Sequence, residues 1–135
     1  MKKILPLLLL PVCFSASAEW VQVGNTSQAN FEKFIDPEKV TQSGPMAIMR
    51  QVWELNNYRQ KGTDDVTSEK ILAEYDCQNR QLRLLKRSRF TGLWSTGTEL
   101  PLDKLSQTDS DWIPIEPKSI EEEIIDTVCP DGRDN

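Results

Sequence analysis

The sequence predicts an α+β fold: a single antiparallel sheet of about six strands, with one C-terminal helix packed on one face and tied by a disulfide. Three observations predict it. Short segments in which polar and apolar residues alternate follow one another between turn residues along most of the chain. One segment near the C-terminus carries the start signals and the apolar stripe of a helix. The mature chain retains two cysteines, Cys77 and Cys129.

Residues 1–18 have the features of a secretory signal peptide and are excluded from the fold. Two lysines precede the apolar run Ile4–Phe14, and the small residues Ala16–Ala18 supply a cleavage site before Glu19. The run is shorter than the about 20 residues of a transmembrane helix, and no later stretch qualifies. An uncleaved anchor helix is the alternative. We therefore expect an exported protein, in the periplasm, on the outer surface of a bacterial envelope or secreted, with 19–135 as its single domain.

Cys13 offers a second route of processing, which is lipidation at a lipobox formed by Leu10–Cys13. A lipobox has a small residue before its cysteine and tolerates proline poorly, and Val12 and Pro11 depart from that pattern. Cleavage after Ala18 is therefore preferred.

Cleavage leaves 117 residues, enough for one core, and changes the formal net charge from −5 to −7 because it removes two lysines. This acidic balance argues against nucleic acid as a partner, since phosphate neutralisation needs a dense basic face. Two cysteines in an exported chain predict one Cys77–Cys129 disulfide, and two free buried thiols are the alternative. The bond would close a loop of 51 residues and stabilise the fold by roughly 4 kcal/mol.

The N-terminal part of the chain predicts three strands. Glu19–Thr26 alternates and ends in Gly-Asn, and Asn30–Asp36 is a second short strand. Asp36–Val40 predicts a turn or a short helical piece, and Gln42–Pro45 predicts a further turn. Met46–Tyr58 predicts a long strand that is covered on both faces at least in part, because apolar residues occur at both parities. Helix is the alternative there, and the Val, Trp and Ile content disfavours it.

The central stretch Ser68–Phe90 predicts a hairpin whose two-residue turn is Gln78-Asn79. The pairs that this register predicts are Tyr75–Leu82 and Ala73–Leu84 on an inner face, and Glu74–Arg83 and Leu72–Leu85 on an outer face. Cys77 lies on the inner parity, where a covering helix can reach it.

The C-terminal part predicts a last strand, Leu93–Leu102, then a polar loop, Leu105–Asp111. Trp112–Pro117 is expected to be extended, because proline disfavours helix in the residue before it. A helix then begins at Ser119, which forms a capping box with Glu122. The apolar stripe that faces the sheet comprises Ile120, Ile124, Ile125 and Val128, with Cys129 beside it.

No catalytic or metal constellation is present in the sequence. The chain has no histidine, which excludes a histidine triad and a histidine metal site. The disulfide consumes Cys77 and Cys129 as nucleophiles, and no G-x-S-x-G elbow occurs. Glu121–Glu123 suit the positive helix start rather than calcium, because no loop donors surround them. We therefore predict a protein that is not an enzyme and holds no metal or cofactor.

Arg83, Arg87 and Arg89 share the outer parity of the hairpin's second strand and form a candidate ligand patch for anionic groups. The alternative is a solvated strand face balanced by Glu69 and Glu74.

A second outer-face candidate is an apolar patch, interpreted either as a dimer or partner surface or as a face covered by the N-terminal strands or loops. Its members are Trp53, Leu55, Leu72, Leu85 and Trp94.

Three groups of residues carry a resemblance to a known family. They are Glu19-Trp20-Val21 with a strand ending in Asp36-Pro37; Val52–Leu55 and Tyr75–Cys77 with Arg80; and Trp112–Ile115, Pro117, Ser119 and Cys129. As an ordered set that covers essentially the whole mature chain, they resemble the surface-adhesin protein E family of small exported bacterial proteins.

The resemblance implies an antiparallel sheet of about six strands with the helix on its concave face, tied by a disulfide. It also implies a homodimeric surface adhesin that binds host extracellular-matrix or serum proteins. The family's namesake is lipid-anchored, whereas the lipobox of this chain is poor and argues against a lipid anchor. The alternative function is a periplasmic module that binds a small anionic ligand or a partner envelope protein. A third possible function is that of a structural envelope component that dimerises through the sheet face.

Overall fold

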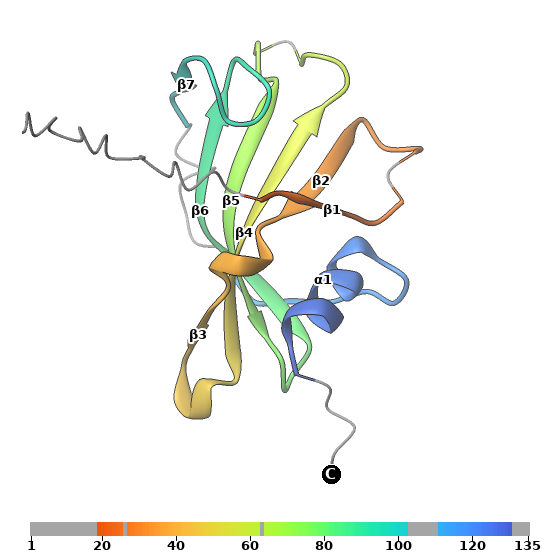
Figure 1. Cartoon of the computed structure of the whole chain (residues 1–135), viewed down its shortest axis with the longest axis vertical. Coiled ribbons are helices and arrows are strands. Elements are labelled where there is room, and N and C mark those ends of the chain that lie inside the picture. Colours follow the sequence, from red (N-terminus) through yellow and green to blue (C-terminus); the bar gives the residue numbers. More distant parts are fainter. Residues whose placement is uncertain (1–18, 26, 63, 103–110, 131–135) are drawn as a thin grey trace, which may run out of the picture.

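The computed structural model describes residues 19–25, 27–62, 64–102 and 111–130, which fold around one antiparallel sheet with one α-helix (Figure 1). The strands of this part of the chain are β1 (Val21–Val23), β2 (Phe31–Ile35), β3 (Thr41–Ser43), β4 (Met49–Tyr58), β5 (Ser68–Asp76), β6 (Gln81–Phe90), β7 (Glu99–Leu100) and β8 (Ile113–Pro114). Its helices are α1 (Ile120–Val128) and the 3-10 helices η1 (Pro37–Lys39) and η2 (Pro45–Ala47). The predicted fold class is confirmed.

The sheet follows the order β1-β2-β4-β5-β6-β7, while β3 pairs with β4 and β8 pairs with β6. The predicted first, second and third strands and both strands of the hairpin are confirmed, and β3 is an additional strand. The predicted signal peptide, the lipobox and the loop Leu105–Asp111, except Asp111, lie outside the described residues.

The predicted strand Leu93–Leu102 is wrong over most of its length, because only Glu99 and Leu100 form β7. Before β7 the chain turns back on itself. The N–H of Thr91 donates to the carbonyl of Thr98 at 3.1 Å. This hydrogen bond closes residues 91–98 into a loop. The alternating residues of this segment therefore do not pair with a neighbouring strand.

The hairpin register is confirmed near the turn, where Tyr75 pairs with Leu82 and Glu74 pairs with Arg83. The turn itself is longer than predicted, since β5 ends at Asp76 and β6 begins only at Gln81. The Asp76 carboxylate accepts hydrogen bonds from the backbone N–H groups of residues 78 and 79, both at 3.0 Å. This cap holds a four-residue loop in place of the two-residue turn.

A β-bulge at Leu85 overturns the register farther along the hairpin. Ala73 still pairs with Leu84, but Leu72 pairs with Lys86 instead of Leu85. The extra residue on β6 shifts its alternation by one, so every later side chain of β6 points to the face opposite to the predicted one.

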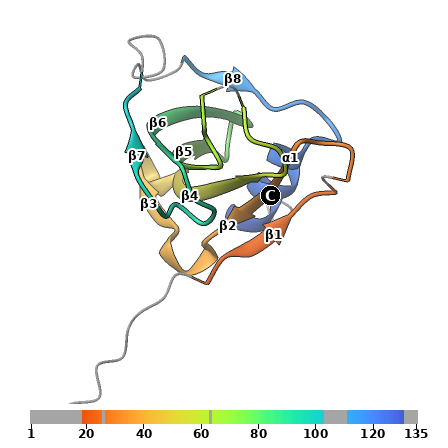
Figure 2. The same cartoon turned by 90° about the horizontal axis from the view of Figure 1, so that it is seen from above.

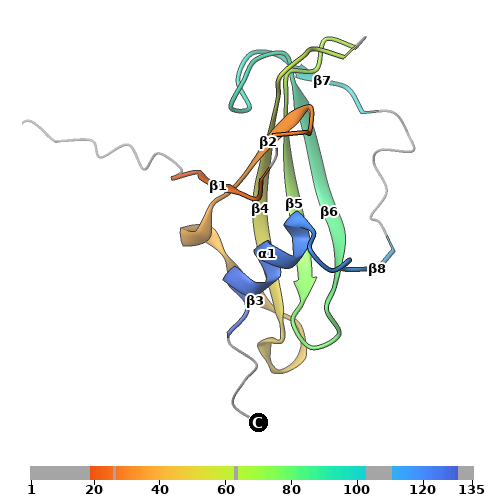
Figure 3. The same ribbon diagram turned by 90° about the vertical axis from the view of Figure 1, so that its right-hand side faces the viewer.

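The two faces of the sheet differ in what covers them. We call the face that carries Val52, Ala73 and Tyr75 the helix face, because α1 packs on it (Figure 3). The opposite face, with Leu55 and Glu74, is the outer face. Seen from above, the sheet is curved and α1 lies on its concave side, as the family resemblance implies (Figure 2).

The core lies between the helix face and α1. Its buried members are Val23, Ile35, Val52, Ala73, Tyr75, Leu82, Ile124 and Ile125. Full burial of an aliphatic side chain of this kind contributes about 1.5–3 kcal/mol, so this cluster is the main attachment of the helix to the sheet.

The predicted helix start is confirmed, with one difference. The Ser119 hydroxyl accepts a hydrogen bond from the Glu122 N–H at 3.1 Å, as a capping box requires. In a capping box the Glu122 carboxylate accepts from the backbone N–H of Ser119, whereas here it accepts from the N–H of Lys118, at 2.7 Å. At the other end Cys129 caps the helix and forms the predicted disulfide with Cys77, which joins two positions 52 residues apart.

Candidate functional site

The three arginines of the predicted ligand patch do not share a face. Arg83 pairs with Glu74 and lies on the outer face, whereas Arg87 and Arg89 follow the bulge at Leu85 and lie on the helix face. The prediction of one outer row is therefore wrong, because it assumed an unbroken alternation along β6. The role of these arginines in ligand binding stays a prediction.

Arg83 is held by neighbours on the outer face. Its guanidinium donates to Glu74 through Nε at 3.0 Å and Nη2 at 2.7 Å, and it lies 4.6 Å from the centroid of the Trp112 ring. Ser43 and Gln51 also donate to Glu74, at 3.0 and 3.1 Å. Burial alone would raise the pKa of the Glu74 carboxyl, but these hydrogen bonds outweigh it and the pKa lies below its usual value.

Arg87 and Arg89 also have acidic partners. Arg87 is ion-paired with the buried carboxylate of Glu69, and Arg89 with Asp64. The Tyr58 hydroxyl donates to Glu69 at 2.8 Å, and burial together with that carboxylate raises the pKa of Tyr58 to about 12. Since each guanidinium faces a carboxylate, the positive charge of this region is largely compensated.

The predicted outer-face apolar patch is mostly covered. Leu55 is fully buried and Leu72 is 8% exposed. Trp53 lies beneath Lys70, whose ammonium is 4.6 Å from the ring centroid. Trp94 comes from the loop of residues 91–98 rather than from a strand, and it packs on Phe34 at 4.6 Å between ring centroids. The loop therefore covers this part of the outer face, which was the second of the two interpretations.

This loop, residues 91–98, is fixed to the sheet by hydrogen bonds from its backbone. The N–H of Trp94 donates to the buried Asn57 side chain, and the N–H of Ser95 donates to the buried Ser68 hydroxyl, both at 2.9 Å. Ser68 in turn donates to the carbonyl of Gly92 at 2.5 Å. These bonds hold Trp94 and Ser95 at φ values of 60° and 54°, a left-handed conformation that costs a residue with a side chain about 1–2 kcal/mol.

The loop presents apolar side chains to solvent although its backbone is fixed. Leu93 and Trp94 are each 45% exposed and lie side by side in the sequence. A large aromatic that is already held in place loses little freedom on binding, and tryptophan is enriched among the residues that dominate protein interfaces. The Leu93–Trp94 tip is therefore the strongest candidate surface for contact with another protein.

The sequence did not predict a polar trio on the helix face. Lys33 donates to Glu54 at 2.7 Å, and the Tyr75 hydroxyl donates to the other oxygen of the same carboxylate. All three are buried, with exposed fractions of 7%, 3% and 0%. One signal for a buried polar group was present in the sequence, because the charged residue Glu54 has the same parity as the apolar Val52. Its partner Lys33 could not be predicted, because the two meet only through the pairing of β2 with β4.

Within the described ranges, no group of three or more acidic, cysteine or histidine side chains is arranged to hold a metal ion. In the same ranges, no helix is long and apolar enough to cross a membrane.

The fold and surface together define a small disulfide-tied sheet domain with one helix and an exposed apolar loop. The chain belongs to the surface-adhesin protein E family, whose model matches residues 20–130. No curated protein sequence matched it.

Solved structures of Haemophilus influenzae protein E share this fold. Crystal form II is 14% identical, with a TM-score of 0.65 over 92% of this chain and 96% of that chain. Another structure of the same protein is 14% identical, with a TM-score of 0.66 over 90% of each chain. Protein E from non-typeable Haemophilus influenzae is 12% identical, with a TM-score of 0.62 over 88% of this chain and 80% of that one. At these identities the likeness shows the fold alone.

Proposed function

We propose that this protein is an exported, non-enzymatic surface adhesin that binds host extracellular-matrix or serum proteins through the Leu93–Trp94 tip. The family to which the chain belongs supports the class of function. The observation that carries the assignment to this surface is the rigid loop that holds two large apolar side chains 45% exposed.

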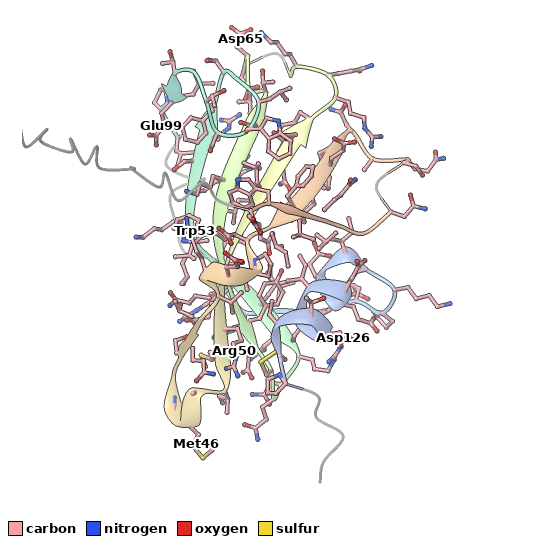
Figure 4. All side chains as sticks on the ribbon, viewed as in Figure 1. Met46, Arg50, Trp53, Asp65, Glu99 and Asp126 are labelled. Carbon is pink, nitrogen blue, oxygen red and sulfur yellow. A yellow bond between two sulfur atoms is a disulfide. The ribbon has the colours of Figure 1, made fainter. Side chains whose placement is uncertain are left out.

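The position of the tip suits contact with a large partner. The loop of residues 91–98 lies at the end of the sheet where Asp65 and Glu99 are found, and Met46 lies at the opposite end (Figure 4). Asn57 and Ser68, which anchor the loop, belong to the central strands β4 and β5. The tip is thus anchored to two strands that are paired along most of their length.

The non-enzymatic part of the proposal has its own support. The whole sequence lacks histidine, and the disulfide occupies both cysteines of the mature chain. Hydrolysis or acyl transfer by a histidine-activated serine or cysteine is therefore unsupported by the residues present.

The experiment is binding of the purified mature chain to immobilised host matrix and serum proteins, with two matched variants. Leu93→Ser is expected to weaken binding about tenfold, or by about 1.4 kcal/mol, because the proposal places Leu93 among the few residues that carry most of the binding energy. Met46→Ser is the control: Met46 is 87% exposed, apolar and at the other end of the sheet, so binding should be unchanged. Equal loss in both variants would remove the tip from the proposal.

The cellular half of the experiment is surface labelling with fractionation. An adhesin must be reached by a membrane-impermeant label on intact cells. A protein that binds no matrix or serum protein, fractionates with the periplasm and escapes the label is not an adhesin, and the periplasmic alternative would replace it.

A further inference from the structure

A pocket of about 340 Å³ lies on the helix face, between the sheet and the segment that joins β8 to α1. Figure 2 shows this segment and α1 on the same side of the curved sheet. The apolar walls of the pocket are Ile71, Leu82, Leu84, Ile113, Pro114 and Ile115. Pockets of this volume with mostly apolar walls and few polar groups are the usual form of small-molecule sites.

Lys33, Glu54 and Tyr75 also line this pocket. The Lys33–Glu54 ion pair, at 2.7 Å, is buried beside the core cluster. A buried ion pair is not an efficient way to stabilise a fold, because desolvation of the two charges offsets their attraction. Polar groups of this kind, fixed in place within an apolar cavity, are better suited to orienting a bound molecule.

The remaining charges of the pocket are negative. Lys33 compensates Glu54, whereas Glu116 and Glu121 add two carboxylates from the segment before α1 and from its first turn. In the described part of the chain neither Glu116 nor Glu121 forms an ion pair. After burial and the Glu54 carboxylate, the charge of Glu121 also raises the pKa of Tyr75. Tyr75 and Glu121 line the same pocket, which agrees with that effect.

We propose that this pocket binds a small organic cation with an apolar body, such as an alkylammonium group. Its charged head would lie against the Glu121 carboxylate, and its body would contact Ile71 and Leu84. A small anion fits less well, because Lys33, the one cation among the described residues that line the pocket, is already engaged by Glu54. The site is separate from the Leu93–Trp94 tip and adds a ligand class to the proposed function.

The test compares three probes of equal chain length at pH 7 by NMR titration of the mature protein. These probes are n-hexylamine, 1-hexanol and hexanoate, which carry positive, zero and negative charge. We expect saturable binding in the order hexylamine, hexanol, hexanoate, with shifts confined to signals of the pocket residues. Absence of saturable hexylamine binding, or hexanoate binding as tight as that of hexylamine, overturns the proposal.

Two variants of α1 separate a specific contact from general charge. Glu121→Gln should weaken hexylamine binding about fivefold, the scale of one partly screened ion pair, and leave hexanol binding unchanged. Glu123→Gln removes an equal charge from the same helical turn, but Glu123 is exposed and does not line the pocket. Hexylamine affinity that falls equally in both variants would show attraction to the helix start in general and would contradict the site.

A filled pocket gives an independent check. Leu84→Trp would occupy the cavity from the β6 wall and should abolish binding of all three probes. The circular dichroism spectrum of the variant establishes that it has folded. A folded Leu84→Trp protein that still binds hexylamine with wild-type affinity would place the bound cation elsewhere.

Discussion

Glu74 shows how one side chain on the outer face organises its neighbours. It is 3% exposed, yet its carboxylate stays charged because three donors from three different strands point at it: Ser43 from β3, Gln51 from β4 and Arg83 from β6. Among the described strands, β3 pairs with β4 and not with β5, so the Glu74 carboxylate adds a polar link between β5 and β3 that no backbone ladder supplies.

This arrangement predicts a pH dependence. The pKa of Glu74 is lower in the fold than its ordinary value of 4.5, so its contribution to stability is present above pH 4.5 and is lost as the pH falls through the folded-state pKa. Glu74→Gln should therefore lower the free energy of unfolding by about 2 kcal/mol at pH 7 and by much less near pH 3. Urea unfolding of both proteins at the two pH values measures the difference, and an equal difference at both values would contradict it.

At the scale of elements, α1 depends on two kinds of attachment. Ile124 and Ile125 are fully buried against the helix face, and the Cys77–Cys129 disulfide ties the helix end to the β5–β6 loop. With nine residues, α1 is shorter than the about 12–15 residues that an isolated helix needs in water. The helix therefore exists because the sheet and the disulfide hold it.

Removal of the disulfide should accordingly cost stability without changing the sheet. The double variant Cys77→Ser with Cys129→Ser should lose about 4 kcal/mol of unfolding free energy, since the bond closes a span of 52 residues. Chemical denaturation measures the loss, and non-reducing mass spectrometry of the native protein should find one peptide that links the two cysteines. Two alkylatable thiols in native protein would contradict the bond itself.

At the scale of the whole molecule, the sequence predicted what depends on local periodicity. The alternation in β5 placed Tyr75 at a buried position, and the capping box placed the start of α1. The bulge at Leu85 was not predicted, because no glycine or proline marks it. The loop at Trp94 was mistaken for a strand, because its left-handed conformation is set by distant residues.

The candidate sites likewise combine features that are visible in the local sequence with features that depend on distant residues. Leu93 and Trp94 were visible as apolar residues, but their exposure depends on anchors at Asn57 and Ser68. The pocket with Lys33 depends on a strand pairing that brings Lys33 to Glu54 across 21 residues of sequence. Non-local contacts of this kind have no signature in a single sequence.

Processing of the N-terminus decides whether these surfaces act on a released or an anchored protein. The sequence predicts cleavage after Ala18, and the first described strand begins at Val21, so the predicted cut precedes every described strand. The intact mass of the protein from its native envelope should therefore match a chain that starts at Glu19 with one disulfide. A lipid-modified chain that starts at Cys13 is the contrary result. The Leu93–Trp94 tip would then act on a membrane-anchored protein rather than on a released one.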